Sequence, residues 1–475
     1  MEMISRRALL LSLAATLVIG IAAFRMIVTT TGGSLVWSDG LAYFFHARSL
    51  VIDGNSDITN EFNEYDRRYP VDRPGSSVMD SIRRNVIRND QGLVISPWPI
   101  GMGMIAVPFY AAGYLVESLV ARWQNRKPDS YGLIPQYFFA LSSLVFGWLG
   151  FWSTYLCCRE ISDKTRSYLA TFAVVLGSPA VFYVFVNPSM AHAVSFGICA
   201  VFVLHWLRHW LREPDVSVMT ALGFLLGLLI TIRLQNAFFG VLLVALVIRQ
   251  VPRSGWSRAS SLALAGLAAC AVPLSALALH SLAYGGSHQS FEIQQNGVAV
   301  IGNYPIHLKS PFFWDVLFSC RHGAFNWTPV LALGAIGLIC FARVKLWIIP
   351  LLIVLLLNIY LIGGIGISDP SGKIPTFDTS NWNDHWKGGA SFGMRYLTEV
   401  MPIFAIGLAA LLNSFFRTTF FKLFLQFVLV AMITWNGSLI LAYGFNTISR
   451  THCVTYGERW VGVLQVLTKL QRNSR

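Results

Sequence analysis

Long apolar segments recur along this chain and restrict its fold more than any other feature. A helix needs about 20 mostly apolar residues to cross the hydrocarbon core of a bilayer. Runs close to that length lie at approximately 8–28, 97–121, 133–157, 168–186, 189–207, 218–232, 235–248, 259–284, 326–342, 346–364, 396–414 and 421–443. Charged residues make up only 12% of the chain. The pattern predicts an all-α polytopic membrane protein with about 11–12 transmembrane helices, as one integral-membrane domain over residues 1–475.

Basic clusters between the runs predict the orientation of the chain, because cytoplasmic loops carry an excess of Lys and Arg. The clusters are Arg122/Arg126/Lys127, Arg159/Lys164/Arg166, Arg208/Arg212, Arg249/Arg253/Arg258, Arg343/Lys345 and Arg417/Lys422. If they are cytoplasmic, the long connections 29–92, 285–325 and 365–395 are outer loops. The formal net charge of +13 is then expected to lie mostly in cytoplasmic loops, where it faces anionic lipid. No nucleic-acid motif accompanies it, so we expect no nucleic-acid partner.

One region does not fit simple alternation. Three apolar runs separate the first outer loop from Asn187-Pro188-Ser189, although both ends should lie outside. Either one run is re-entrant or one basic cluster faces outward, and the runs at 97–121 and 133–157 are the suspects. The side of the C-terminus stays open. The run at 8–28 reads as an uncleaved anchor, and the seven cysteines predict neither a metal site nor a disulfide framework.

The first outer loop carries a concentration of acidic residues, and one of them begins a predicted helix. At 3.6 residues per turn, Asp39, Tyr43, His46 and Asp53 fall within about 80° of arc on that helix. A carboxylate beside the membrane can take the proton of an acceptor hydroxyl, so Asp39 is the candidate base, with the other three binding substrate. The alternative is an interfacial helix whose apolar side chains lie in lipid.

Four further positions place His or Arg near predicted outer ends of apolar runs. They are His192, which follows a proline-broken stretch at 177–189, Arg233, the pair Arg321-His322, and Arg395. The planar fork of arginine pairs two oxygens of a phosphate. We therefore expect at least two of the three arginines to converge within one cavity near Asp39. The alternative is that each one snorkels separately into lipid headgroups.

Several of these motifs resemble one family. The motifs occur in order over roughly residues 36–404: Ser38-Asp39-Gly40 with Tyr43, Ser49-Leu50 followed by Asp53-Gly54-Asn55-Ser56-Asp57, Asn187-Pro188-Ser189-Met190-Ala191-His192, Arg233-Leu234-Gln235-Asn236, Ser319-Cys320-Arg321-His322-Gly323 and Gly389-Ala390-Ser391-Phe392-Gly393-Met394-Arg395-Tyr396-Leu397. Together they resemble bacterial GT-C glycosyltransferase-like membrane proteins, a superfamily with protein O-mannosyltransferases and lipid A aminoarabinose transferases. The resemblance implies a polyprenyl-phosphate-linked donor and a catalytic Asp in the first outer loop, which is carried onto Asp39. The paired-acid and WWD-type motifs of oligosaccharyltransferases are not seen, which disfavours that reaction.

The leading hypothesis is a glycosyltransferase that moves a sugar from a polyprenyl-phosphate donor to an acceptor hydroxyl at the outer face of a bacterial inner membrane. The alternatives are a glycan polymerase or ligase, and a transporter or flippase of a lipid-linked sugar. A transporter is expected to show paired polar groups near mid-membrane and often inverted repeats, and the sequence shows neither plainly. The donor sugar, the acceptor (glycan, lipid or protein) and any need for a divalent metal cofactor stay open.

Overall fold

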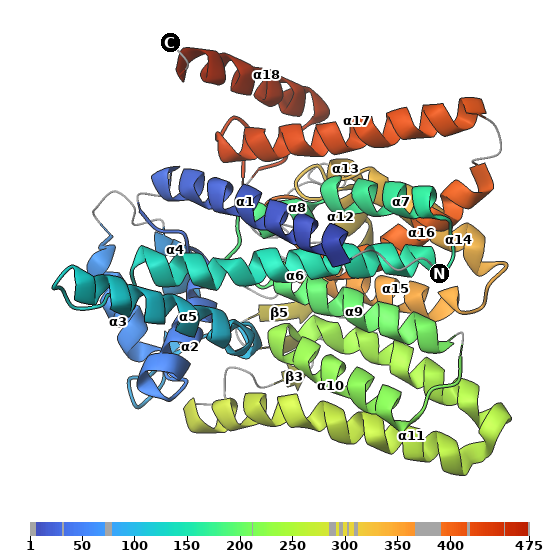
Figure 1. Ribbon diagram of the computed structural model, residues 1–475, viewed down its shortest axis with the longest axis horizontal. Coiled ribbons are helices and arrows are strands. Elements are labelled where there is room, and N and C mark those ends of the chain that lie inside the picture. The colour runs from blue at the N-terminus through green and yellow to red at the C-terminus, as the bar shows by residue number, and fades with distance from the viewer. Residues whose placement is uncertain are drawn as a thin grey trace.

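The chain folds as a bundle of long helices, with the short helices of residues 40–85 gathered at one end (Figure 1). The computed structural model describes residues 6–30, 33–71, 78–210, 212–284, 291–293, 298–301, 304–307, 312–365, 391–415, 419–450 and 452–473. Most of the predicted loop 365–395 lies outside these residues. The helices are α1 (Arg6–Thr30), α2 (Gly40–Arg48), α3 (Thr59–Arg68), α4 (Asp80–Asn85), α5 (Gly101–Trp123), α6 (Leu133–Arg159), α7 (Lys164–Leu176), α8 (Pro179–Phe185), α9 (His192–Trp210), α10 (Val216–Ile232), α11 (Gly240–Tyr284), α12 (Phe313–Phe318), α13 (Ala324–Trp327), α14 (Val330–Ala342), α15 (Ile348–Gly364), α16 (Met401–Phe415), α17 (Thr419–Gly444) and α18 (Tyr456–Asn473).

The predicted all-α polytopic membrane fold is confirmed. Within the described residues, seven helices are long and apolar enough to cross a membrane, or eight if the bent pair α7–α8 forms one span. Three shorter apolar helices, α10, α14 and α15, coincide with further predicted runs. The helix α11 has a break at Gly255, where φ is 80°, so it covers the two predicted runs 235–248 and 259–284.

Strands are few and short in the described part of the chain. β1 (Ile87–Arg88) pairs antiparallel with β2 (Val94–Ile95) in the first outer loop. β3 (Phe291–Ile293), β4 (Val298–Ile301) and β5 (Tyr304–His307) form an antiparallel sheet in the order β3-β4-β5 within the predicted loop 285–325.

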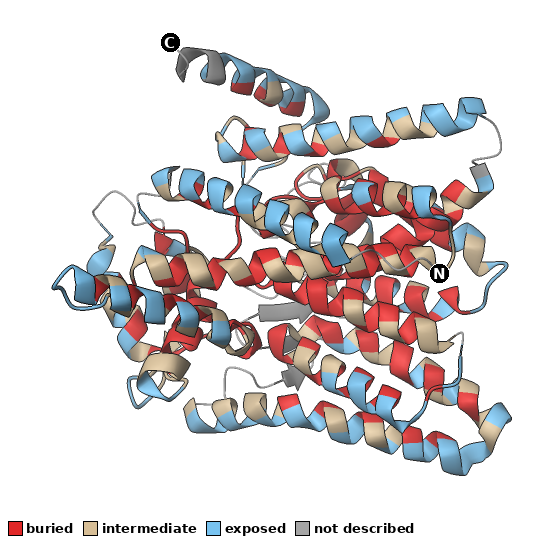
Figure 2. Ribbon diagram, in the orientation of Figure 1, coloured by how far each residue is buried: buried red, intermediate tan, exposed pale blue. Residues whose placement is uncertain are grey.

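Burial separates a central group of helices from a peripheral one (Figure 2). In their most apolar windows, 83% of the segment ending in α16 and 72% of α9 are buried, against 17% of α1 and of α17. Peripheral helices with exposed apolar faces are what a lipid-facing surface requires, because lipid is as apolar as the side chains. The central helices α9 and α16 are therefore the rigid elements on which polar residues can be held away from lipid.

Close packing of α14 against α16 fixes the position of the latter. A Cβ atom added at Gly337 would lie 1.9 Å from the carbonyl oxygen of Gly407, and one at Gly407 would lie 2.1 Å from that of Gly334. Only glycine permits this approach, which is the small-residue packing typical of membrane helices. The 3₁₀ helix Arg395–Val400 leads directly into α16, so this contact holds the segment that carries Arg395.

The proline-broken stretch forms the predicted break, and the contacts favour the second of the two predicted alternatives for the topology, a basic cluster that faces outward. α7 and α8 are bent by 69° at residues 177–178, whereas α5 and α6 are continuous helices of 23 and 27 residues. In addition, Arg68 of the first loop pairs with Asp129 at 2.9 Å. The connection from α5 to α6 thus lies on the same face as residues 29–92. This contact favours Arg122/Arg126/Lys127 as the cluster that faces outward; part of its charge is neutralised by an Arg126–Glu117 ion pair of 2.5 Å.

A disulfide corrects the expectation for the cysteines. Cys320 and Cys453 are bonded, with their Cα atoms 5.1 Å apart. Persistent disulfides belong to oxidising compartments, which agrees with an outer position for the turn that contains Arg321. The same bond places the segment between α17 and α18 on that face. The other five cysteines are free, and four of them are buried.

Candidate functional site

Asp39 is placed by a strained turn and directed away from its own helix. The preceding residue, Ser38, has φ of 59°, in the left-handed region that non-glycine residues rarely adopt. Asp39 is the N-cap residue of α2, yet its side chain makes no cap hydrogen bond. Instead the carboxylate accepts hydrogen bonds from Ser81 Oγ at 2.7 Å and Ser38 Oγ at 3.2 Å. An N-cap carboxylate that leaves its helix uncapped is available for another role.

The helix α2 is buried along its whole length, so it is not an interfacial helix lying on lipid. At its start, a Cβ atom on Gly40 would lie 2.2 Å from Ser189 Oγ, which places the Asn187-Pro188-Ser189 segment directly against Asp39's helix. On α5, a Cβ atom on Gly103 would lie 2.6 Å from the Cβ of His46. These two close approaches fix α2 between the bend after α8 and the start of α5.

Arg395 joins Asp39 across 356 residues of sequence. Its Nη1 lies 3.4 Å from Asp39 Oδ2, and its Nη2 donates to the hydroxyl of Tyr396 at 2.9 Å. The turn before it depends on Gly393, whose φ is 56°, a conformation that favours glycine. The Nε of Arg395 is buried and has no hydrogen-bond partner among the described residues. The guanidinium is therefore only partly satisfied by protein groups.

Arg233 reaches the same place from another element. It lies in extended conformation where α10 ends and the 3₁₀ helix Leu234–Phe239 begins, so it sits in a turn between apolar helices. Its guanidinium carbon lies 5.4 Å from the ring centroid of Tyr396, and that of Arg395 lies 4.8 Å from the same centroid. Two of the three predicted arginines thus meet at the ring of Tyr396, and one of them, Arg395, contacts Asp39. A cavity that the two share stays a prediction.

The sequence reasoning missed Glu399, which is fully buried at the end of this cluster. Its Oε1 lies 3.1 Å from Arg233 Nε and 3.3 Å from His192 Nδ1. The signal was present in the sequence, because Glu399 is a carboxylate inside the predicted run 396–414, where an ionisable residue is costly without a partner.

Tyr43 lies one helical turn after Asp39 and shares its surroundings. Burial raises the pKa of Tyr43 above its usual range, and the charges of Arg233, Asp39, Arg395 and Glu399 all act on it. Its phenol therefore stays protonated at neutral pH and can donate a hydrogen bond toward this cluster.

His46 and Asp53 contact groups other than Asp39, and their role in binding substrate stays a prediction. The ring of His46 packs edge-on against that of His280 with centroids 5.1 Å apart. Asp53 pairs with Arg48 and accepts from Asn60 Nδ2 at 2.9 Å. For Asp53 the helix type changes: residues Ser49–Asp53 form a π-helix, whose wider turn breaks the 3.6-residue period used for the prediction. His46 precedes that segment and lies within α2.

Arg321 and His322 occupy the turn between α12 and α13, next to the disulfide. Both are buried. The His322 ring lies 5.8 Å from that of Trp327, which in turn packs 5.9 Å from Phe392, close in sequence to Arg395. They therefore border the cluster through two aromatic rings, rather than stacking on Tyr396 as Arg233 and Arg395 do.

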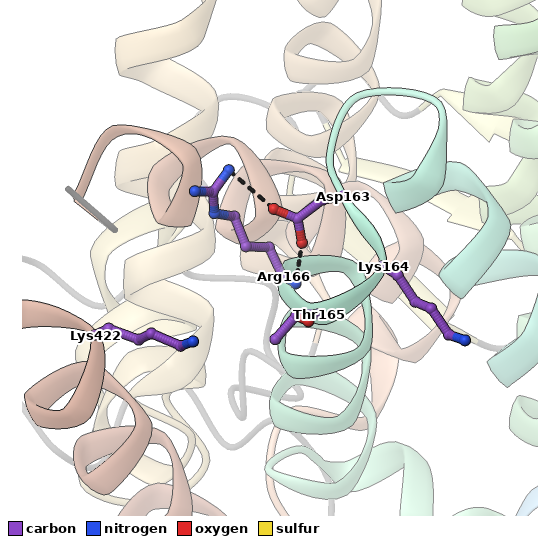
Figure 3. A pocket seen from close by; sticks show the side chains of 5 residues that line it. All are labelled: Asp163, Lys164, Thr165, Arg166 and Lys422. Atoms are coloured by element: carbon purple, nitrogen blue, oxygen red, sulfur yellow. Dashed lines mark hydrogen bonds and ion pairs between the residues drawn. The ribbon is translucent and has the colours of Figure 1, made fainter. Parts of the chain in front are cut away.

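One described pocket contains none of these residues. It has a volume of about 310 Å³ and is lined by Asp163, Lys164, Thr165, Arg166 and Lys422 (Figure 3). Asp163 caps α7 through the backbone N–H of Arg166 at 2.9 Å and pairs with its guanidinium at 3.0 Å. In the part of the chain that the structure describes, no group of three or more His, Cys, Asp or Glu residues could hold a metal ion.

Known structures share this architecture. No protein-family model and no curated protein sequence match the chain. The crystal structure of ArnT from Cupriavidus metallidurans bound to undecaprenyl phosphate matches with a TM-score of 0.52 and 14% identity, over 96% of this chain and 69% of that one. Its apo structure matches with a TM-score of 0.51, 13% identity, and 96% and 68% coverage. The Archaeoglobus fulgidus oligosaccharyltransferase gives a TM-score of 0.41 with 12% identity, over 95% and 54%. The chain thus has the GT-C fold, as its motifs predicted.

Proposed function

We propose that this chain is a glycosyltransferase that uses a polyprenyl-phosphate-linked sugar, with Asp39 as the base. The proposal rests on one observation: the carboxylate of Asp39 contacts Arg395, which lies with Arg233 over the ring of Tyr396. A glycosyl transfer from a lipid phosphate needs both groups: a base for the acceptor and cations for the leaving phosphate. The GT-C fold, found also in a protein crystallised with undecaprenyl phosphate, supports this donor class.

The arginines are suited to the phosphate. Arg395 has one nitrogen without a described partner and one in a long contact of 3.4 Å to Asp39, so it can exchange part of its protein contacts for phosphate oxygens. Tyr396 holds both guanidinium groups by its ring face, which leaves their edges for hydrogen bonding. Charge-assisted bonds of this type are roughly twice as strong as neutral ones.

The reaction then follows from the two roles. Asp39 accepts the proton of the acceptor hydroxyl as its oxygen attacks the anomeric carbon. The bond from that carbon to the phosphate oxygen breaks, and its electron pair leaves with the polyprenyl phosphate, whose added negative charge is stabilised by Arg395 and Arg233. Attack opposite to the leaving phosphate inverts the anomeric configuration. Binding of a phosphate to Arg395 also draws that cation from Asp39, which frees the carboxylate to contact the acceptor hydroxyl when the donor is in place.

The experiment is a transfer assay with the purified full chain in lipid nanodiscs. Labelled polyprenyl-phosphate sugars are offered one at a time, with bacterial cell-envelope glycans, lipids and proteins as acceptors. We expect label to leave the polyprenyl phosphate with one donor and to appear on one acceptor class. If the chain neither binds nor consumes any polyprenyl-phosphate sugar, the proposal is wrong. Movement of the intact lipid-linked sugar between leaflets would instead indicate a flippase.

A further inference from the structure

The cluster beside Asp39 contains a second carboxylate whose role differs from that of Asp39. Glu399 and His192 are both fully buried, while Asp39 keeps 9% exposure. Asp39 is held by two hydroxyls and one long ion pair. Glu399 is instead surrounded by three partners from two other elements, which are Arg233, His192 and Gln235.

The contacts around Glu399 form a closed ring. Its Oε1 is shared by Arg233 Nε at 3.1 Å and His192 Nδ1 at 3.3 Å. Its Oε2 accepts from Gln235 Nε2 at 3.5 Å, and Gln235 Oε1 accepts from Arg233 Nη2 at 3.2 Å. Gln235 Nε2 also donates to the carbonyl oxygen of Tyr396 at 2.9 Å. Arg233 is therefore held on two edges of its guanidinium.

This ring also fixes the proton of His192. A carboxylate only accepts, so Nδ1 must carry the hydrogen that faces Glu399. Arginine only donates, so Nε2, which lies 3.4 Å from Arg233 Nη1, must be the accepting nitrogen. A neutral His192 with this tautomer satisfies both contacts, and a protonated one would oppose Arg233. Both ring nitrogens of His192 are thus used in holding Arg233, and neither is free to move a substrate proton.

We propose that Glu399 is a positioning residue that, with His192 and Gln235, fixes the guanidinium of Arg233 for the donor phosphate. The inference rests on the proposed function, since it assigns Arg233 to that phosphate. Glu399 supplies a counter-charge, so that Arg233 can remain buried beside Arg395 without a ligand. It is enclosed by protein groups and does not contact the reacting atoms.

The test measures binding of undecaprenyl phosphate to the full chain in nanodiscs for wild type, Glu399→Gln, Arg233→Ala and the double variant. Removing the charge loosens Arg233, so Glu399→Gln should weaken binding about tenfold, the effect of roughly one charge-assisted hydrogen bond. In the Arg233→Ala background the same change should have no further effect, because the group that Glu399 positions is gone. The KM of the acceptor should stay unchanged.

The matched control is Glu160→Gln, which removes an ion pair with Arg208 of 2.9 Å, between two residues outside the Asp39 cluster. It should leave binding unchanged. If Glu399→Gln does not fold, Gln235→Ala weakens the same ring and should lower affinity about threefold, again only when Arg233 is present. Losses that add independently in the double variant, or a Glu399→Gln affinity within twofold of wild type, would overturn this role. A wild-type chain that does not bind undecaprenyl phosphate would refute the proposed function itself.

Discussion

Gly40→Ala tests whether close packing at the start of α2 positions Asp39. A Cβ atom at this position would lie 2.2 Å from Ser189 Oγ, 2.5 Å from Ser189 Cβ and 2.9 Å from the Ser189 carbonyl oxygen. The backbone oxygen cannot rotate away, so α2 or the Asn187-Pro188-Ser189 segment must move by several tenths of an ångström. Overpacking of this kind costs about 1–3 kcal/mol. A displacement approaching 1 Å at a catalytic group can reduce the rate about 100-fold.

The assay compares transfer rate and melting temperature of the purified variants in nanodiscs. Gly40→Ala should lose about 10–100-fold in kcat and melt at a lower temperature. Gly437→Ala is the control, because that position, in helix α17, has no atom within 4 Å of an added Cβ; it should keep both properties. Ser189→Gly combined with Gly40→Ala removes two of the three clashes and should recover part of the rate. Wild-type rate and stability in Gly40→Ala would refute the packing argument.

Two further perturbations probe the surroundings of the site. Arg459 is fully buried and donates to the carbonyl oxygens of Cys320 at 2.8 Å and Asn326 at 2.9 Å, so it anchors α18 to the turn around the disulfide. Arg459→Met should therefore destabilise the chain by about 3 kcal/mol, measured by thermal melting, whereas Arg450→Met, at an exposed position, should not. Equal melting temperatures of the two variants would contradict this role of Arg459. Burial lowers the pKa of His46 well below its usual 6.5, so this side chain takes up a proton in the unfolded chain but not in the folded one, and stability falls as the pH drops below about 6.5. His46→Gln should therefore reduce the dependence of the melting temperature on pH between about pH 6.5 and 5. An unchanged dependence would show that another group titrates.

The membrane fold was predictable because its rule is simple. A helix that crosses a bilayer needs a long apolar run, and such runs are visible one at a time in the sequence. The break at residues 177–178 was also predictable, since Pro179 cannot continue the preceding helix. The orientation of the Arg122/Arg126/Lys127 cluster could not be read from a count of basic residues, because the Arg68–Asp129 ion pair that joins this connection to the first loop is a tertiary contact.

The site was only partly predictable. Arg233 and Arg395 could be chosen because arginines near span ends are costly without a partner, and Asp39 because its carboxylate begins a predicted helix beside the first span. Their meeting at Tyr396 depends on helix packing across hundreds of residues, which periodicity does not encode. Asp53 was misplaced because nothing in the sequence marks the π-helix at Ser49–Asp53. The Cys320–Cys453 bond, with a sequence separation of 133, likewise follows from tertiary structure.

The most direct test of Asp39 as the base is the single-turnover rate of Asp39→Asn at saturating donor. The substitution keeps the shape of the side chain and its contacts with Ser81 and Ser38, but removes the group that takes the proton. We predict that undecaprenyl phosphate binding persists while the rate of sugar transfer falls about 10²–10⁴-fold. The matched variant Asp163→Asn, in the pocket of Figure 3, should transfer at the wild-type rate. A purified Asp39→Asn chain that binds the donor and transfers sugar at the wild-type rate would contradict the central claim.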